Sequence, residues 1–253
     1  TLPETNVTVT ISNYVGPDFV WTARVSTATS RLPADGSGWT SVSPWTLTTN
    51  RTPDGTKVWY CGNSATRQYT NGTYAALQLP QVTVTTQTLL KFTHWMKCEL
   101  GSGNQAWDGG VVQVSTNSGT SWSSLVPAEG YPYAIVPNPD SPFAADEPCF
   151  ADTAGTWREE WFDLSSFVGR TVRIRCVFGS DTATVDEGWY VASPVVYGFS
   201  GVSPVLVPTT ATGGVLSQQS SADVQWHVNR GALTPQVQKD LLIVVFGNTP
   251  DLL

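Results

Sequence analysis

Residues 106–133, AWDGGVVQVSTNSGTSWSSLVPAEGYPY, constrain the fold more than any other stretch of the chain. Residues 112–115 alternate apolar Val with polar Gln and Ser, and this period of two predicts a strand with one packed face and one face toward solvent. Residues 117–119 (Asn-Ser-Gly) tolerate the left-handed backbone that a tight hairpin needs. Trp122 follows, where an aromatic side chain can cover the returning strand. The stretch therefore predicts a hairpin in an all-β domain and contains no evident nucleophile.

Composition favours an exported all-β protein. Only 13% of the 253 residues are charged, and the 22 Gly and 11 Trp accompany abundant Thr, Ser and Val. The net charge of -7 and the lack of a Lys/Arg cluster argue against nucleic acid as a partner. No apolar run approaches the length of a membrane span. Because Thr1 begins no signal peptide, we expect a mature or excised fragment.

Five blocks of sequence, taken in order, resemble the MAM-like jelly-roll module that accompanies secreted bacterial proteases of the immune inhibitor A type. The resemblance covers roughly residues 35–200. It implies a jelly-roll β-sandwich that acts as an accessory to other domains, on the cell surface or after secretion. The resemblance does not define a function, because the module accompanies many different catalytic domains. The blocks are residues 58–80, 89–99, 106–122, 162–181 and 187–198.

The two chain ends are expected to fold together. Each end holds strand patterns but too few strands for a stable sandwich of its own. We therefore expect a discontinuous Ig-like β-sandwich from residues 1–29 and 202–253, with a jelly-roll domain of residues 30–201 inserted in one of its loops. The alternative is two separate partial domains. The expected strands of the ends are 7–11, 20–23, 224–228 and 241–246, and one short helical turn is expected at 163–167.

The usual catalytic constellations are missing. His94 and His227 are far apart and lie in expected strands, so no His-Glu-x-x-His zinc motif exists, and no Gly-x-Ser-x-Gly elbow is present. We expect no catalytic residue. For His94 we expect a hydrogen-bonded histidine inside the sandwich, with a metal-ligand role as the alternative.

Carboxylates at strand ends are the candidate metal ligands. Such loops supply the hard oxygen ligands that Ca²⁺ accepts in irregular coordination. The resemblance also implies structural calcium, with Glu99, Asp108 and Asp181 at the family's acidic positions. One difference from the family weakens the implied calcium site, because residues 192–193 are Ala-Ser where the family commonly has an Asp. The alternative is that the two Asp accept hydrogen bonds from turn amides. The candidate set is Glu99, Asp108, Asp181 and Glu187.

Sugar or protein contact is the expected task. Exposed aromatic rings in loops can stack on pyranose rings, so the candidate ligand-binding residues are Trp107, Tyr131, Tyr133 and Trp157. The partners would be neighbouring domains of the parent protein and a glycan or a cell-surface protein. A carbohydrate-binding module and a jelly-roll glycoside hydrolase remain alternatives, although no two acids here are placed by strand alternation on one open face.

Four widely spaced cysteines lack a Cys-x-x-Cys pair, which disfavours zinc and favours disulfides in an oxidising compartment. Three connectivities are possible, and the pairing we expect is Cys61 with Cys149 and Cys98 with Cys176. For Cys176 the alternative is a small buried apolar residue, since it alternates with other apolar residues on one strand face.

Overall fold

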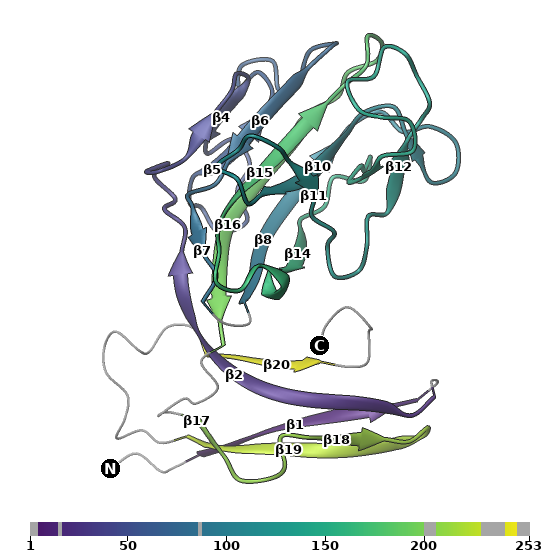
Figure 1. Cartoon of the computed structure of the whole chain (residues 1–253). Coiled ribbons are helices and arrows are strands. Elements are labelled where there is room, and N and C mark those ends of the chain that lie inside the picture. Colours follow the sequence, from purple (N-terminus) through teal and green to yellow (C-terminus); the bar gives the residue numbers. More distant parts are fainter. Residues whose placement is uncertain (1–4, 15–16, 86–87, 200–205, 229–240, 247–253) are drawn as a thin grey trace. The chain divides into compact units, whose positions relative to one another are not determined.

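The computed structural model describes residues 5–14, 17–85, 88–199, 206–228 and 241–246. The chain forms two compact units. Unit 1 combines residues 1–29 with residues 197–253, and unit 2 is the continuous segment of residues 30–196. The second junction thus lies after Val196 rather than at residue 201. Apart from one 3₁₀ turn at Ser165–Phe167, the regular structure of the described residues is β-strand, so the expected all-β fold is confirmed (Figure 1).

One layer of unit 2 is a sheet in which β10 and β15 pair antiparallel along their whole length, with Gly109 opposite Gly179. β7 (Val82–Thr83) pairs with β15 beside this sheet. The strands follow the order β11 (Ser123–Ser124), β10 (Gly109–Ser115), β15 (Thr171–Gly179), β6 (Tyr74–Gln78) and β3 (Thr40–Ser41).

The other layer of unit 2 contains β8 between β14 and β16, and β5 pairs with both β16 and β4. A small third sheet lies beside these layers and joins β13, β12 and β9. The strands of the second layer are β14 (Arg158–Asp163), β8 (Thr88–Lys97), β16 (Gly188–Gly198), β5 (Val58–Cys61) and β4 (Trp45–Thr48), and those of the small sheet are β13 (Pro148–Cys149), β12 (Tyr133–Ile135) and β9 (Gln105–Ala106).

The core of unit 2 follows from alternation on these strands. In β15 the residues at every second position, from Val172 to Phe178, are fully buried, whereas Thr171 is exposed. They meet side chains of the other layer, including Phe92 and Trp189, in one apolar cluster. Burying such side chains stabilises the fold by about 1.5–3 kcal/mol each. The arrangement is the β-sandwich that the sequence predicted.

Unit 1 joins the two ends of the chain. β1 (Thr5–Asn13) pairs antiparallel with β19 (Ser220–Val228), and β2 (Phe19–Arg31) pairs with β20 (Leu241–Phe246), so the expected pairing between the ends is confirmed. Two short strands complete the sheets, β17 beside β19 and β18 beside β2. The buried residues between the layers include Trp21, Val224 and Trp226. The short strands are β17 (Leu206–Pro208) and β18 (Gly213–Leu216).

The cysteine prediction is wrong in its main form. All four cysteines are free and buried, and all four belong to the apolar core of unit 2, where a free Cys packs as a small hydrophobic residue. The Cys98 thiol also donates to the Asp108 carbonyl at 3.2 Å. The alternative for Cys176 is confirmed, since this residue is 0% exposed on β15 opposite Val112 and Leu77. Burial raises the pKa of the Cys149 thiol to about 12 and also raises the pKa of the Cys61 thiol. The corrected residues are Cys61, Cys98, Cys149 and Cys176.

Candidate functional site

Three of the four predicted metal ligands meet at one end of the sandwich. Asp108 immediately precedes β10 and Asp181 follows β15, and the pairing of these strands brings both to the same end. Glu99 follows β8, and its carbonyl oxygen accepts hydrogen bonds from the amides of Trp107 (3.1 Å) and Asp108 (3.3 Å). One carboxylate oxygen of each acid lies within 4.8 Å of the others. We call Glu99, Asp108 and Asp181 the acidic trio.

Neutral donors already contact the acidic trio. The Tyr69 hydroxyl donates to Asp108 Oδ2 at 2.6 Å, and the Asp181 amide donates to Asp108 Oδ1 at 2.8 Å. Asn138 Nδ2 donates to Asp181 Oδ2 at 2.9 Å. Glu99 Oε2 is buried and has no hydrogen-bond partner in the described part of the chain. The Ala183 amide also donates to Asp181 Oδ1 at 2.8 Å. The alternative that both Asp accept backbone amides is therefore confirmed, although the buried Glu99 Oε2 still has no partner among the described residues.

Burial of the Asp108 side chain, which is 0% exposed, raises the pKa of its carboxyl from 3.8 to about 6. The hydrogen bonds from Tyr69 and from the Asp181 amide act in the opposite direction, while the negative charges of Asp181 and Glu99 raise this pKa further. The ionised form of Asp108 is thus costly in the folded protein unless a cation offsets the charge.

Glu187, the fourth predicted metal ligand, lies in a different network. Its carboxylate binds Arg51 (Nη2 to Oε2, 3.0 Å) and Arg67 (Nη2 to Oε1, 2.6 Å) and accepts the Tyr190 hydroxyl at 2.9 Å. Burial alone would raise the pKa of Glu187, but the hydrogen bonds from Arg67, Tyr190 and Arg51 outweigh it, and the pKa is lowered. Because two cations already neutralise this carboxylate, the prediction of Glu187 as a ligand beside the other three is corrected.

The predicted ligand-binding aromatics are not gathered at one place. The Tyr131 hydroxyl donates to Leu125 O at 2.8 Å and accepts from the Val112 amide at 2.9 Å, so its role is to tie a loop to β10. Tyr133 packs beside it on the main core, and Trp157 packs on a second apolar cluster on the outer face of β5 and β16. Trp107 is half-buried next to Asp108. These four side chains do not line the groove described next.

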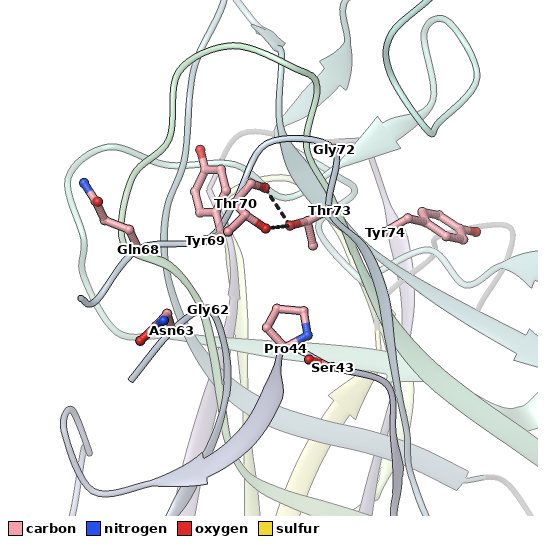
Figure 2. A pocket seen from close by; sticks show the side chains of 10 residues that line it. All are labelled: Ser43, Pro44, Gly62, Asn63, Gln68, Tyr69, Thr70, Gly72, Thr73 and Tyr74. Atoms are coloured by element: carbon pink, nitrogen blue, oxygen red, sulfur yellow. Dashed lines mark hydrogen bonds between the residues drawn. The ribbon is translucent and has the colours of Figure 1, made fainter. Parts of the chain in front are cut away.

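A groove of about 600 Å³ opens between loops of unit 2. Figure 2 shows Gln68 and Tyr74 extending from opposite ends of it, with Pro44 and Asn63 between them on the lower side. Among the lining side chains, hydrogen bonds join only Thr70 and Thr73, whose hydroxyl oxygens lie 3.1 Å apart. We call it the loop groove, and its lining residues are Ser43, Pro44, Gly62, Asn63, Gln68, Tyr69, Thr70, Gly72, Thr73 and Tyr74.

The loop groove was not predicted from the sequence. The turn signals at residues 62–63 and 71–72 mark loops, but they do not show that these loops meet residues 43–44. The groove and the acidic trio are connected through Tyr69, which is one of the lining residues and whose hydroxyl contacts Asp108. The Gly72 amide also donates to the Asp181 carbonyl at 2.6 Å.

His94 has the role expected from the sequence. Its Nδ1 accepts a hydrogen bond from Trp189 Nε1 at 3.0 Å, and the side chain is buried between Phe150 and Phe92. Its Nε2 lies 3.4 Å from Glu160 Oε1. His94 therefore belongs to the core. The described residues contain no helix with the length and hydrophobicity needed to cross a membrane.

Neither a known protein family nor a curated protein matches the sequence of the chain. Among solved structures, the glycoside hydrolase domain of Endo-D from Streptococcus pneumoniae R6 is 16% identical (TM-score 0.38), and the match covers 68% of this chain but only 23% of that one. The K1 cleaved adhesin domain of Lys-gingipain from Porphyromonas gingivalis W83 is 14% identical over 70% of this chain and 98% of that one (TM-score 0.38). TmCBM61, solved with β-1,4-galactotriose, is 10% identical over 64% and 88% (TM-score 0.36).

Proposed function

We propose that this chain is a non-catalytic accessory module of an exported multi-domain protein, and that it holds a protein or a glycan in the loop groove. The observation that carries the proposal is the chemistry of the groove lining. The ten lining residues include no carboxylate, imidazole, thiol or amine. A hydrolase needs a general acid and a base or nucleophile at its bound substrate, so the groove is suited to binding without turnover.

The hydrogen bonds of two candidate acids support this reading. Asp108 is buried and its two oxygens accept hydrogen bonds from Tyr69 and the Asp181 amide, while Glu187 is held by two arginines. A glycoside hydrolase requires two carboxyl groups that flank a bound sugar. The glycosidase alternative therefore has no pair of acids on the wall of the groove.

The acidic trio fits a calcium ion as a structural component of the module. The buried Glu99 Oε2 has no partner within the described residues. Burial raises the pKa of Asp108, and the negative charges of Asp181 and Glu99 raise it further, so a cation here would stabilise the ionised carboxylate. Hard carboxylate oxygens are the ligands that Ca²⁺ prefers. Glu99, Asp108 and Asp181 would hold the ion, which would offset their mutual repulsion and fasten the loop after β8 to the ends of β10 and β15.

The kinship with MAM-like modules and the location outside the cell also belong to this proposal. They rest on the five blocks of sequence and on the low content of charged residues. The free thiols do not support a location outside the cell, because four unpaired cysteines do not require an oxidising compartment.

Binding and turnover can be separated in one experiment. The chain would be applied to arrays of glycans and of surface proteins, once with calcium and once with a chelator, and soluble products would be measured in parallel. We expect a bound ligand and no released sugar or peptide. Ligand-dependent release of product, lost in Asp108→Asn or Glu187→Gln, would contradict the non-catalytic function.

A further inference from the structure

We propose that the ligand of the loop groove is a neutral oligosaccharide, with the exposed ring of Tyr74 contacting one sugar at one end and the amide groups of Asn63 and Gln68 contacting another at the opposite end. This inference rests on the proposed function and names the chemical class of its ligand. Three features of the groove carry it, namely its charge, its backbone hydrogen bonds and its shape.

The lining favours a neutral ligand rich in hydroxyl groups. It contributes side-chain amides, hydroxyls, glycine backbone and a proline ring, but none of the ten residues is charged at neutral pH. A phosphate, sulfate or carboxylate group would lose its hydration without gaining an ion pair within this lining. Sugar hydroxyls both donate and accept, and they match the amide side chain of Gln68. They also match the Nδ2 donor of Asn63, whose Oδ1 already accepts the Ala65 and Thr66 amides.

The backbone of the groove is poorly suited to an extended peptide. A peptide that adds a strand to a sheet needs free main-chain donors and acceptors along the edge. Here the Tyr69 amide donates to Asp186 O (3.1 Å) and the Gly72 amide to Asp181 O (2.6 Å), while the Thr73 amide donates to Ser180 Oγ (3.0 Å). These three amides are already satisfied inside the module, so they are not available to pair with an added strand, and side chains are the groups left to recognise a ligand along this part of the groove.

The groove is also large enough for more than one sugar ring. Its volume of about 600 Å³ falls within the range of small-ligand sites, and Gln68 and Tyr74 lie at its two ends. Tyr74 is 51% exposed and packs edge-on against Phe143, with ring centroids 5.9 Å apart. Because the Tyr74 ring is exposed and also packs against Phe143, it can contact the apolar face of a sugar with little loss of conformational entropy.

The test compares variants by calorimetric titration with the neutral oligosaccharide that binds best in an array of neutral and acidic glycans. Tyr74→Ala removes the aromatic ring and Gln68→Ala removes the amide. Tyr14→Ala, at a tyrosine that is 77% exposed in unit 1, and Gln218→Ala, at an exposed glutamine, are the matched controls. Because all four positions are exposed, unchanged melting curves should show that folding is intact.

We expect Tyr74→Ala to weaken binding about tenfold and Gln68→Ala severalfold, with both controls within twofold of the wild type. Neutral-glycan binding that is the same in all five proteins would overturn the groove as the site while leaving the non-catalytic function in place. Binding of only acidic glycans, or of only protein ligands, would overturn the ligand class and likewise spare the proposed function. The absence of any ligand on both arrays would overturn the inference and the proposed function together.

Discussion

The hydroxyl of Tyr69 donates a 2.6 Å hydrogen bond to the buried carboxylate of Asp108, so one side chain joins the wall of the loop groove to the acidic trio. Tyr69 is 2% exposed and its ring packs edge-on against Phe178 at 5.0 Å. Burial, and then the contact with Asp108, raises the pKa of the Tyr69 hydroxyl far above its ordinary value of 10.0. The phenol therefore stays protonated and remains a donor at every physiological pH.

Removal of that hydroxyl should destabilise the fold. A hydrogen bond to a charged group contributes about 1.5–3 kcal/mol, and Tyr69→Phe leaves Asp108 with one donor fewer in a buried site. We expect the free energy of unfolding in urea at pH 7.5 to fall by about 2 kcal/mol. Tyr74→Phe, at the exposed tyrosine that begins β6, is the control and should change the free energy of unfolding by less than about 0.5 kcal/mol. Equal values for the two variants would contradict the role assigned to Tyr69.

Calcium should stabilise the folded chain. If the ion binds only to the native state, a hundredfold excess over the dissociation constant raises the free energy of unfolding by about 2.7 kcal/mol. A chelator should then lower the melting temperature of the wild type, and Asp108→Ala should abolish the difference between calcium and chelator. Glu129→Gln, at an exposed acid outside the acidic trio, should keep the difference. A wild-type melting curve that ignores both calcium and chelator would refute the calcium assignment.

The calcium-free protein should lose stability as the pH rises. The folded pKa of Asp108 is about 6 and its ordinary value is 3.8, so the folded state binds more protons than the unfolded state between these values. Protonated Asp108 contributes its full stabilisation of the fold below about pH 4. This stabilisation, about 3 kcal/mol, is lost as the pH rises through about 6. The measurement is the free energy of unfolding of the wild type against pH in the presence of a chelator.

Asp108→Asn supplies the reference for that pH series, because other acids also titrate. The difference in free energy of unfolding between the wild type and the variant should decrease as the pH rises from 4 to 7. If the variant does not fold, the carboxyl ¹³C signal of Asp108 in the wild type reports its titration directly. A titration midpoint of Asp108 near 4 would show that burial does not raise its pKa. A difference in free energy of unfolding that does not depend on pH would show the same.

All four cysteines should react as thiols. Because Cys61, Cys98, Cys149 and Cys176 are unpaired, a thiol reagent added to denatured, unreduced protein should count four thiols per chain. In the native protein the same reagent should react slowly, since every one of these side chains is buried. Fewer than four thiols after denaturation would restore the disulfide prediction made from the sequence.

The strands were predictable because alternation is a local signal. The apolar positions of β15 and of β1 are set by the two-residue period of the pleat, and burial of one face selects them. The strand at β10 departs from the pattern at Ser115, which is 2% exposed rather than facing solvent, because its hydroxyl accepts the Gly119 amide and donates to Asn117. A polar residue next to a tight turn is buried there by a local hydrogen-bond network that alternation does not encode.

The site was only partly predictable, because side-chain partners come from remote segments. Position at a strand end correctly grouped Asp108 with Asp181, since β10 and β15 are neighbours. The same criterion misplaced Glu187, whose partners Arg51 and Arg67 lie 136 and 120 residues away in the sequence. The loop groove combines residues 43–44 with residues 62–74, and no periodic pattern records that these loops meet.

The most direct test of the binding function is to map the ligand by amide NMR of the whole chain. The bound neutral oligosaccharide should shift the signals of residues 62–63 and 68–74, and it should leave the signals around Tyr131, Tyr133 and Trp157 in place. Shifts centred on those three aromatic residues, with none in residues 62–74, would contradict the loop groove as the ligand site.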